Sequence, residues 1–177
     1  AGEIKGLYVQ GENPAMSDPN ANHAREALSK LDTLIVQDIF LTETAYLADI
    51  VLPASAFPEK TGTFTNTDRR VQLARKAVNP PGDSKQDLWI IQELAKRMGL
   101  DWNYNGPDEV YDELSGCMES MKNISWERLV NEGAVTYPCD DKDKPGNEVI
   151  FGEGFPTANK KGRLVPVSYT HLRAHET

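Results

Sequence analysis

The chain has 177 residues, which is enough for one domain with a hydrophobic core and too few for two large ones. Apolar residues make up 39% of it, and no run approaches the roughly 20 apolar residues that cross a bilayer, so direct membrane insertion is not expected. The formal net charge of -8 leaves no basic face to neutralise phosphates, which argues against nucleic-acid binding. A single nucleotide ligand is compatible with this composition.

The chain opens with a short apolar run that is typical of a strand. Residues 7–9 lead into the Gly-Glu-Asn-Pro turn at 11–14, whose glycine permits close backbone approach and whose proline excludes a continuing strand. A helix of three to four turns is expected next, with Ser17 or Asp18 as its cap and Pro19 in its first turn.

Two more strands follow at the spacing of a βαβαβ unit. The run 33–36 predicts a buried strand that ends at Gln37 and Asp38. Thr42 opens a short helix, and residues 49–53 form the third strand. Such a unit packs right-handed, and ligands of open parallel sheets bind beyond the carboxyl ends of the strands. Those ends here are 11–14, Gln37-Asp38 and 53–55.

The remaining sequence predicts a hairpin, three helices and a loop-rich end. They are expected at 62–73 for the hairpin, at 88–98, 108–118 and 126–132 for the helices, and beyond Gly133 for the loops. The predicted fold class is α/β: a Rossmann-like βαβ domain with a parallel sheet at 1–100, then a mostly helical and loop-rich segment of the same domain at 101–166.

No residue set predicts catalysis or metal binding within the chain. Cys117 and Cys139 form no C-x-x-C pair, so two reduced structural thiols are expected instead of iron-sulfur or zinc ligands. His23 is expected on the surface of the first helix, without a nucleophile to activate. The G-x-G-x-x-G fingerprint is missing from the first strand-helix turn, so a nucleotide would need another binding mode.

The last eleven residues differ in character from the rest. Val167 to Thr177 reads VSYTHLRAHET and resembles the translation of a transposase adapter used in shotgun sequencing libraries. We expect this tail to be an artefact attached to an internal fragment of a longer protein. His171 and His175 are therefore not expected to bind a metal, despite their helical spacing.

Six phrases, taken together and in order, resemble the formate dehydrogenase branch of the molybdopterin oxidoreductase superfamily. They are LYVQGENP at 7–14, IVQDIFLTETA at 35–45, ADIVLP at 48–53, EKTGTFTN at 59–66, DRRVQ at 68–72 and AKRMG at 95–99. The resemblance covers Ala1 to Pro166. It implies a Rossmann-like domain that holds one of two molybdopterin guanine dinucleotides.

The resemblance also implies which residues contact that cofactor. Gly11 and Asn13 would meet its guanosine or phosphates through the first turn, and Gln37 and Asp38 through the second. Ala54 follows the third strand, where a small residue lets a ligand lie against the backbone.

Asp87 matches the acid that reads guanine in the family. A carboxylate can accept hydrogen bonds from both N1–H and N2–H of guanine, an edge that adenine does not offer. A plain helix N-cap is the structural alternative for this residue. Arg69 and Arg70 could pair with cofactor phosphate, but a structural role is favoured for both.

The implied parent oxidises formate to carbon dioxide, or runs the reverse reaction, at a molybdenum or tungsten centre. Its metal ligand, its iron-sulfur clusters and its electron-transfer subunits would belong to sequence outside this chain, which is expected to be inactive alone and cytoplasmic. Two alternatives are a non-catalytic iron-sulfur scaffold subunit of NADH-quinone oxidoreductase and an assimilatory-type nitrate reductase. The presence of Asn13, Gln37 and Asp87 argues against the scaffold.

Overall fold

A computed structural model describes residues 2–165, so the adapter-like tail lies outside the described residues. The chain forms two compact units. Of the described residues, the first unit comprises 2–60 and 75–103, and the second comprises 61–74 and 104–165. The predicted division at residue 100 stays a prediction.

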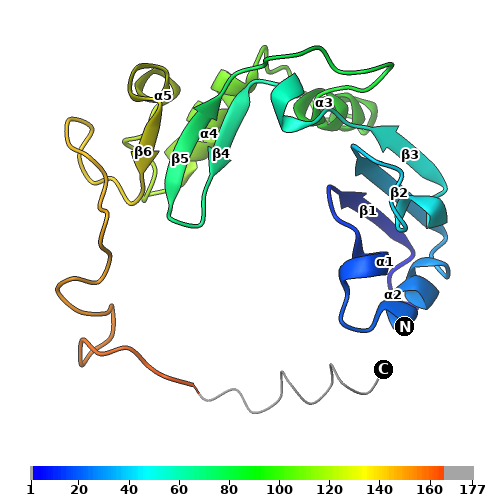
Figure 1. Ribbon diagram of the computed structural model, residues 1–177, viewed down its shortest axis with the longest axis horizontal. Coiled ribbons are helices and arrows are strands. Elements are labelled where there is room, and N and C mark those ends of the chain that lie inside the picture. Colours follow the sequence, from blue (N-terminus) through cyan, green and yellow to red (C-terminus); the bar gives the residue numbers. More distant parts are fainter. Residues whose placement is uncertain (1, 166–177) are drawn as a thin grey trace. The chain divides into compact units, whose positions relative to one another are not determined.

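The first unit is built on a parallel sheet of three strands in the order β1-β2-β3 (Figure 1). These are β1 (Gly6–Gln10), β2 (Thr33–Asp38) and β3 (Ile50–Pro53). Val9 pairs with Val36 in the register, and Val36 pairs with Val51. The α/β class with a Rossmann-like parallel sheet is therefore confirmed.

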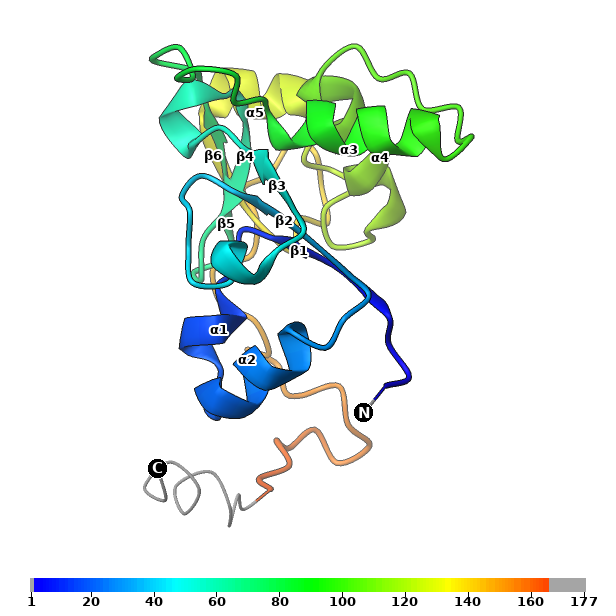
Figure 2. The ribbon, with the colours of Figure 1, turned by 90° about the vertical axis from the view of Figure 1, so that its right-hand side faces the viewer.

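One face of this sheet carries the core of the first unit. Alternate residues of β1 and β2 point to the same face, as the strand period requires. Their buried side chains pack with residues of the helices α1 (Pro14–Ser17), α2 (Ala21–Leu28) and the short 3-10 helix η1 (Ala45–Leu47). Figure 2 shows α1 and α2 next to each other. The buried cluster is Val9, Ala15, Leu28, Leu34, Val36 and Ala45.

The helical segment after β1 differs from the predicted single helix. Asp18 has an extended backbone, because it precedes Pro19 and the α region is disfavoured there. The chain therefore breaks between α1 and α2, and Asn20 caps α2 by accepting a hydrogen bond from the His23 backbone N–H at 3.2 Å. The predicted cap at Ser17 or Asp18 is wrong, whereas the exposed position of His23 is confirmed.

The first unit is completed by a 3-10 helix, η2 (Phe57–Glu59), and by α3 (Asp87–Arg97). α3 buries Ile90 and Ala95, and carries Lys96 and Arg97 in its last turn, where positive charge stabilises a helix end.

The second unit contains an antiparallel sheet in the order β4-β5-β6 with two helices. Its elements are β4 (Gly62–Thr65), β5 (Arg70–Ala74), α4 (Pro107–Cys117), α5 (Trp126–Glu132) and β6 (Ala134–Thr136). Its core is formed by Val71, Tyr111, Met121, Ile124, Leu129, Val135 and Cys139. Burial raises the pKa of Tyr111 to about 12.

Two details of the second unit bear on the sequence predictions. β6 lies where only loop was expected, because a three-residue strand is formed by its pairing with β5 and has no pattern of its own. The Arg69 guanidinium donates hydrogen bonds to the backbone carbonyls of Tyr137, Asn147 and Glu148 at 2.6, 3.0 and 2.6 Å. Arg69 thus has the structural role that was favoured for it.

Candidate functional site

The carboxyl ends of the three parallel strands border a polar hollow of about 320 Å³ in the first unit. This is the edge where the topology of an open parallel sheet places ligands. The lining residues are Gly11, Gln37, Asp38, Ile39, Phe40, Ala54, Ser55, Ala56, Phe57, Lys60 and Asp87. The structure thus brings together every residue expected to contact the cofactor except Asn13.

Gly11 follows β1 directly and has a left-handed backbone with φ of 62°. Its N–H donates to the Gln37 carbonyl oxygen at 2.9 Å, which continues the pairing of the two strands into the hollow. No other group lies within 4 Å of the position that a Cβ would take. Glycine is favoured here by its backbone conformation, and the backbone stays open to the hollow.

Gln37 is completely buried, and both ends of its amide are used within the first unit. Its Oε1 accepts a short hydrogen bond from the Tyr8 hydroxyl, and its Nε2 donates to Asp87 Oδ1 at 2.6 Å. Desolvation, followed by the charge of Asp87, raises the pKa of Tyr8. Tyr8 therefore stays a protonated donor at neutral pH.

Asp87 is the first residue of α3, and its carboxylate faces the hollow instead of capping the helix. Gln86 occupies the N-cap position, so the structural alternative for Asp87 does not apply. Lys60 forms a short ion pair with Asp87 Oδ2 and also donates to the Ser55 carbonyl at 3.0 Å. The side chains of Lys60 and Asp87 are 24% and 25% exposed, which leaves each of them reachable from the hollow.

The turn after β2 is held by Asp38. Its Oδ1 accepts hydrogen bonds from the backbone N–H groups of Ile39 and Phe40 at 2.7 and 3.1 Å. Such a local side-chain bond is the usual way in which Asp stabilises a turn. The negative charge of Asp38 is thereby partly compensated where the chain leaves the strand.

The end of β3 places two small residues at the hollow. Ala54 donates its N–H to the Asp38 carbonyl at 3.0 Å, and Ser55 donates its N–H to the Lys85 carbonyl at 2.9 Å. Ser55 is fully buried, and its Oγ has no hydrogen-bond partner among residues 2–165. A buried hydroxyl without a partner is costly, so its position beside the hollow calls for a physical explanation.

Asn13 lies in the same turn as Gly11 but does not line the hollow. Its Oδ1 accepts from the Thr44 N–H at 3.1 Å and from Thr44 Oγ1 at 2.8 Å, while its Nδ2 donates to Glu43 Oε2 at 2.7 Å. The side chain therefore ties the turn after β1 to the segment before η1. Its predicted cofactor contact stays a prediction.

Lys60 is the site residue for which the sequence assigns no role. It belongs to the Glu-Lys-x-Gly phrase that carries part of the family resemblance, and that phrase is the one signal that points to it. Lys60 and Asp87 are 27 residues apart, so no local spacing predicts their ion pair.

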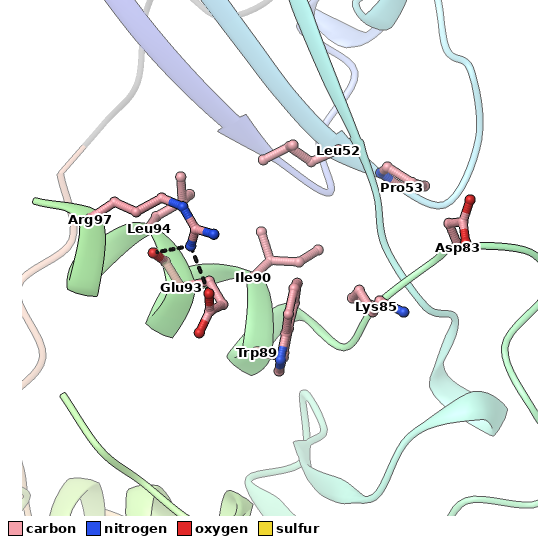
Figure 3. Close-up of a pocket in the computed structure, with 9 residues that line it drawn as sticks. All are labelled: Leu52, Pro53, Asp83, Lys85, Trp89, Ile90, Glu93, Leu94 and Arg97. Atoms are coloured by element: carbon pink, nitrogen blue, oxygen red, sulfur yellow. Dashed lines mark hydrogen bonds and ion pairs between the residues drawn. The ribbon is translucent and has the colours of Figure 1, made fainter.

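A second hollow in the first unit, of about 410 Å³, has a different character (Figure 3). Leu52, Ile90 and Leu94 form its apolar wall beside Trp89. Arg97 is held by the Glu93 carboxylate at 2.7 Å, and Lys85 Nζ lies 5.9 Å from the centre of the Trp89 ring. The polar hollow is the better candidate, because it lies at the carboxyl edge of the parallel sheet, where open α/β sheets bind their ligands.

Residues 2–165 hold no group of three or more His, Cys, Asp or Glu side chains placed to bind a metal ion. Within the same residues no helix is long and apolar enough to cross a membrane. Cys117 is exposed, Cys139 is buried, and both are free thiols.

The parallel sheet with a polar hollow at its carboxyl edge defines a Rossmann-like α/β protein. Within that class the chain belongs to the molybdopterin oxidoreductase family, whose family model matches residues 1–97. This finding confirms the resemblance carried by the sequence phrases.

Relatives of this chain include two formate dehydrogenase subunits. It is 48% identical to the F420-dependent formate dehydrogenase subunit alpha of Methanocaldococcus jannaschii, over 96% of this chain and 25% of that protein. It is 44% identical to the F420-dependent formate dehydrogenase 2 subunit alpha of Methanococcus maripaludis, again over 96% of this chain and 25% of the relative. The chain thus spans about a quarter of the length of these relatives.

Among solved structures, the acetylene hydratase from Pelobacter acetylenicus has a similar fold. The TM-score is 0.59 at 27% sequence identity, and the match covers 75% of this chain and 18% of the hydratase chain.

Proposed function

We propose that the chain is part of a formate dehydrogenase catalytic (alpha) subunit, and that its first unit binds the guanine end of one molybdopterin guanine dinucleotide. The observation that carries this proposal is the Asp87 carboxylate, held by Gln37 and Lys60 at the wall of the polar hollow. The family match and the formate dehydrogenase relatives support it.

The hydrogen-bonding state of Asp87 suits a guanine base. Each carboxylate oxygen accepts one hydrogen bond within the chain, from Gln37 on Oδ1 and from Lys60 on Oδ2. A carboxylate has about four lone-pair sites, so both oxygens keep capacity for the N1–H and N2–H of guanine. Adenine presents an acceptor at N1, which a carboxylate repels.

The other lining groups suit a dinucleotide with its phosphates. The backbone at Gly11 is open to close approach, and the Ser55 hydroxyl is an unused donor. Lys60 neutralises Asp87, and backbone N–H groups compensate Asp38, so the hollow presents little uncompensated negative charge to a phosphate. The residues present therefore fit the group.

The bound cofactor would supply the molybdenum or tungsten centre at which formate gives up two electrons to become carbon dioxide. The residues of this chain would bind and orient its guanine end. In this proposal the iron-sulfur clusters and electron-transfer subunits belong to the whole enzyme, which works in the cytoplasm.

Calorimetric titration of the 177-residue chain with guanosine and adenosine diphosphates tests the proposal. We expect guanosine diphosphate to bind at least about tenfold more tightly, since hydrogen bonds to a charged group contribute about 1.5 to 3 kcal/mol. Asp87→Asn should abolish the preference. Asp32→Asn is the matched control, because Asp32 directly precedes β2, at the end of that strand away from the hollow.

Equal binding of the two diphosphates by a chain that melts cooperatively would contradict the proposal and favour a scaffold relative without the cofactor. A preference that survives Asp87→Asn would place the base elsewhere in the first unit.

A further inference from the structure

Four polar side chains form a continuous hydrogen-bonded network at the hollow. Tyr8 donates to Gln37, Gln37 donates to Asp87, and Lys60 donates to the same carboxylate from its other side. They come from β1, β2, the start of α3 and the residue after η2, so the network joins four separate segments of the first unit. Only Asp87 has been given a role in reading the base.

The direction of the hydrogen bonds fixes the orientation of the Gln37 amide. The Asp87 carboxylate can only accept, so Nε2 of Gln37 faces it, and Oε1 is left to accept from the Tyr8 hydroxyl. The opposite amide orientation would set a carbonyl oxygen against the carboxylate. This partly buried network favours one amide orientation, because the opposite one loses the hydrogen bond to Asp87.

The same network fixes the plane of the Asp87 carboxylate. The carboxylate of an aspartate rotates easily about the bond that joins it to Cβ. A hydrogen-bond donor on one oxygen alone restricts this rotation only in part. Gln37 on Oδ1 and Lys60 on Oδ2 restrain both oxygens. Lys60 is restrained in turn by its hydrogen bond to the Ser55 carbonyl. The carboxylate can accept hydrogen bonds from two adjacent N–H groups of one base only when its plane has a suitable orientation.

We propose that Lys60, Gln37 and Tyr8 are positioning residues that set the Asp87 carboxylate to accept both N–H groups of guanine at once. Base selectivity at the hollow is then a property of the network and not of Asp87 alone. This inference rests on the proposed function and deepens it.

Binding of a nucleotide whose base is hypoxanthine tests this inference separately from the proposed function. It keeps the N1–H of guanine and lacks the 2-amino group, so inosine diphosphate can make one of the two hydrogen bonds. A carboxylate held in place distinguishes guanine from hypoxanthine by the second hydrogen bond. A carboxylate that turns freely makes a single strong bond to either base and distinguishes them poorly.

The test is calorimetric titration of the 177-residue chain with guanosine, inosine and adenosine diphosphates. Lys60→Met and Tyr8→Phe remove one member of the network each, and Lys60→Arg keeps the positive charge and the donors. Lys30→Met and Tyr46→Phe are matched controls in the same unit, because Lys30 pairs with Glu26 on the surface and Tyr46 is 74% exposed.

In the unaltered chain we expect guanosine diphosphate to bind about tenfold more tightly than inosine diphosphate. Lys60→Met should reduce that ratio to about two, Tyr8→Phe should reduce it by a smaller factor, and Lys60→Arg should restore most of it. The controls should keep the full ratio. A general loss of structure would weaken all three nucleotides together and leave the ratio unchanged.

The outcomes separate the two claims. An unaltered chain that prefers guanine over adenine, with a guanine-to-hypoxanthine ratio that neither Lys60→Met nor Tyr8→Phe changes, overturns the positioning role and leaves the proposed function standing. An unaltered, cooperatively melting chain without any guanine preference overturns both. Should Lys60→Met fail to fold, Tyr8→Phe and Lys60→Arg decide the question, because they conserve size or charge.

Discussion

Gln37 and Asp87 lie 50 residues apart in the sequence, yet Gln37 Nε2 donates a hydrogen bond of 2.6 Å to Asp87 Oδ1. Gln37 is completely buried next to the last residue of β2, and Asp87 begins the helix α3. This bond therefore links the carboxyl edge of the parallel sheet to the start of α3. It makes the amide of Gln37 a structural requirement of the hollow as well as part of its wall.

Gln37→Glu should destabilise the first unit strongly at neutral pH. The new carboxylate would face Asp87 in a buried position, and an uncompensated buried charge costs about 3 to 5 kcal/mol. The loss should diminish as the pH falls and the glutamate is protonated. Urea unfolding at pH 7 and pH 5 measures the effect.

Gln10→Glu is the control for this substitution. Gln10 is the register partner of Gln37 on β1, but its side chain is exposed. A glutamate there should change the free energy of unfolding by about 0.5 kcal/mol or less. Equal effects of the two substitutions would show that the buried amide has no special role.

Gly11→Ala should cost about 1 kcal/mol through the backbone alone. The residue has φ of 62°, and no group other than its chain neighbours lies within 4 Å of the added Cβ, so the cost comes from left-handed conformation and not from a clash. Gly11→Asn should cost less, since asparagine adopts that conformation more readily. Gly62→Ala, where the space is also open and φ is ordinary, serves as control in thermal unfolding.

The sequence predicts the parallel sheet well, because its strands are short runs of consecutive apolar residues bounded by turns. β2 carries Leu34 and Val36 between such boundaries, and the structure buries both. The helix after β1 is predicted less well. Asn20, Asp18 and Ser17 are all good caps, and the extended backbone imposed by Pro19 on the residue before it decides among them.

The site is predicted from the family phrases more than from local pattern. From local pattern alone, an aspartate before an apolar helix is as compatible with a helix cap as with a ligand contact. The hydrogen bonds of Asp87 to Gln37 and Lys60 form between segments far apart in the sequence. The unpartnered hydroxyl of Ser55 likewise depends on how the end of β3 is covered. Such tertiary relationships leave no periodic signal.

Tyr111→Phe should remove an alkaline loss of stability from the second unit. Burial raises the pKa of Tyr111 to about 12, above its ordinary value near 10. As the pH rises, the unfolded chain therefore loses this proton before the folded chain does. The contribution of Tyr111 to the free energy of unfolding is complete below about pH 10 and disappears as the pH rises toward 12. The expected loss across that range is about 2 to 3 kcal/mol.

Denaturant unfolding between pH 8 and pH 12 checks this prediction. At pH 8 the phenylalanine variant should be as stable as the unaltered chain or slightly more so, because the buried Tyr111 hydroxyl has no hydrogen-bond partner in the described part of the chain. Tyr46→Phe, at an exposed position, should leave the alkaline loss in place. An identical pH dependence of the Tyr111→Phe variant and the unaltered chain would assign the loss to another group.

Ser55→Ala and Ser84→Ala should affect stability in opposite ways, although both serines are buried in the first unit. Ser84 Oγ donates to the Pro81 carbonyl at 2.8 Å, so its removal should cost about 1 kcal/mol. Ser55 Oγ has no partner among the residues that the structure describes, so its removal relieves a desolvated hydroxyl and should leave stability unchanged or raise it by up to about 1 kcal/mol. Thermal unfolding of the two variants side by side measures the difference. A destabilised Ser55→Ala would mean that the hydroxyl already has a partner, and would remove the unused donor from the proposed nucleotide site.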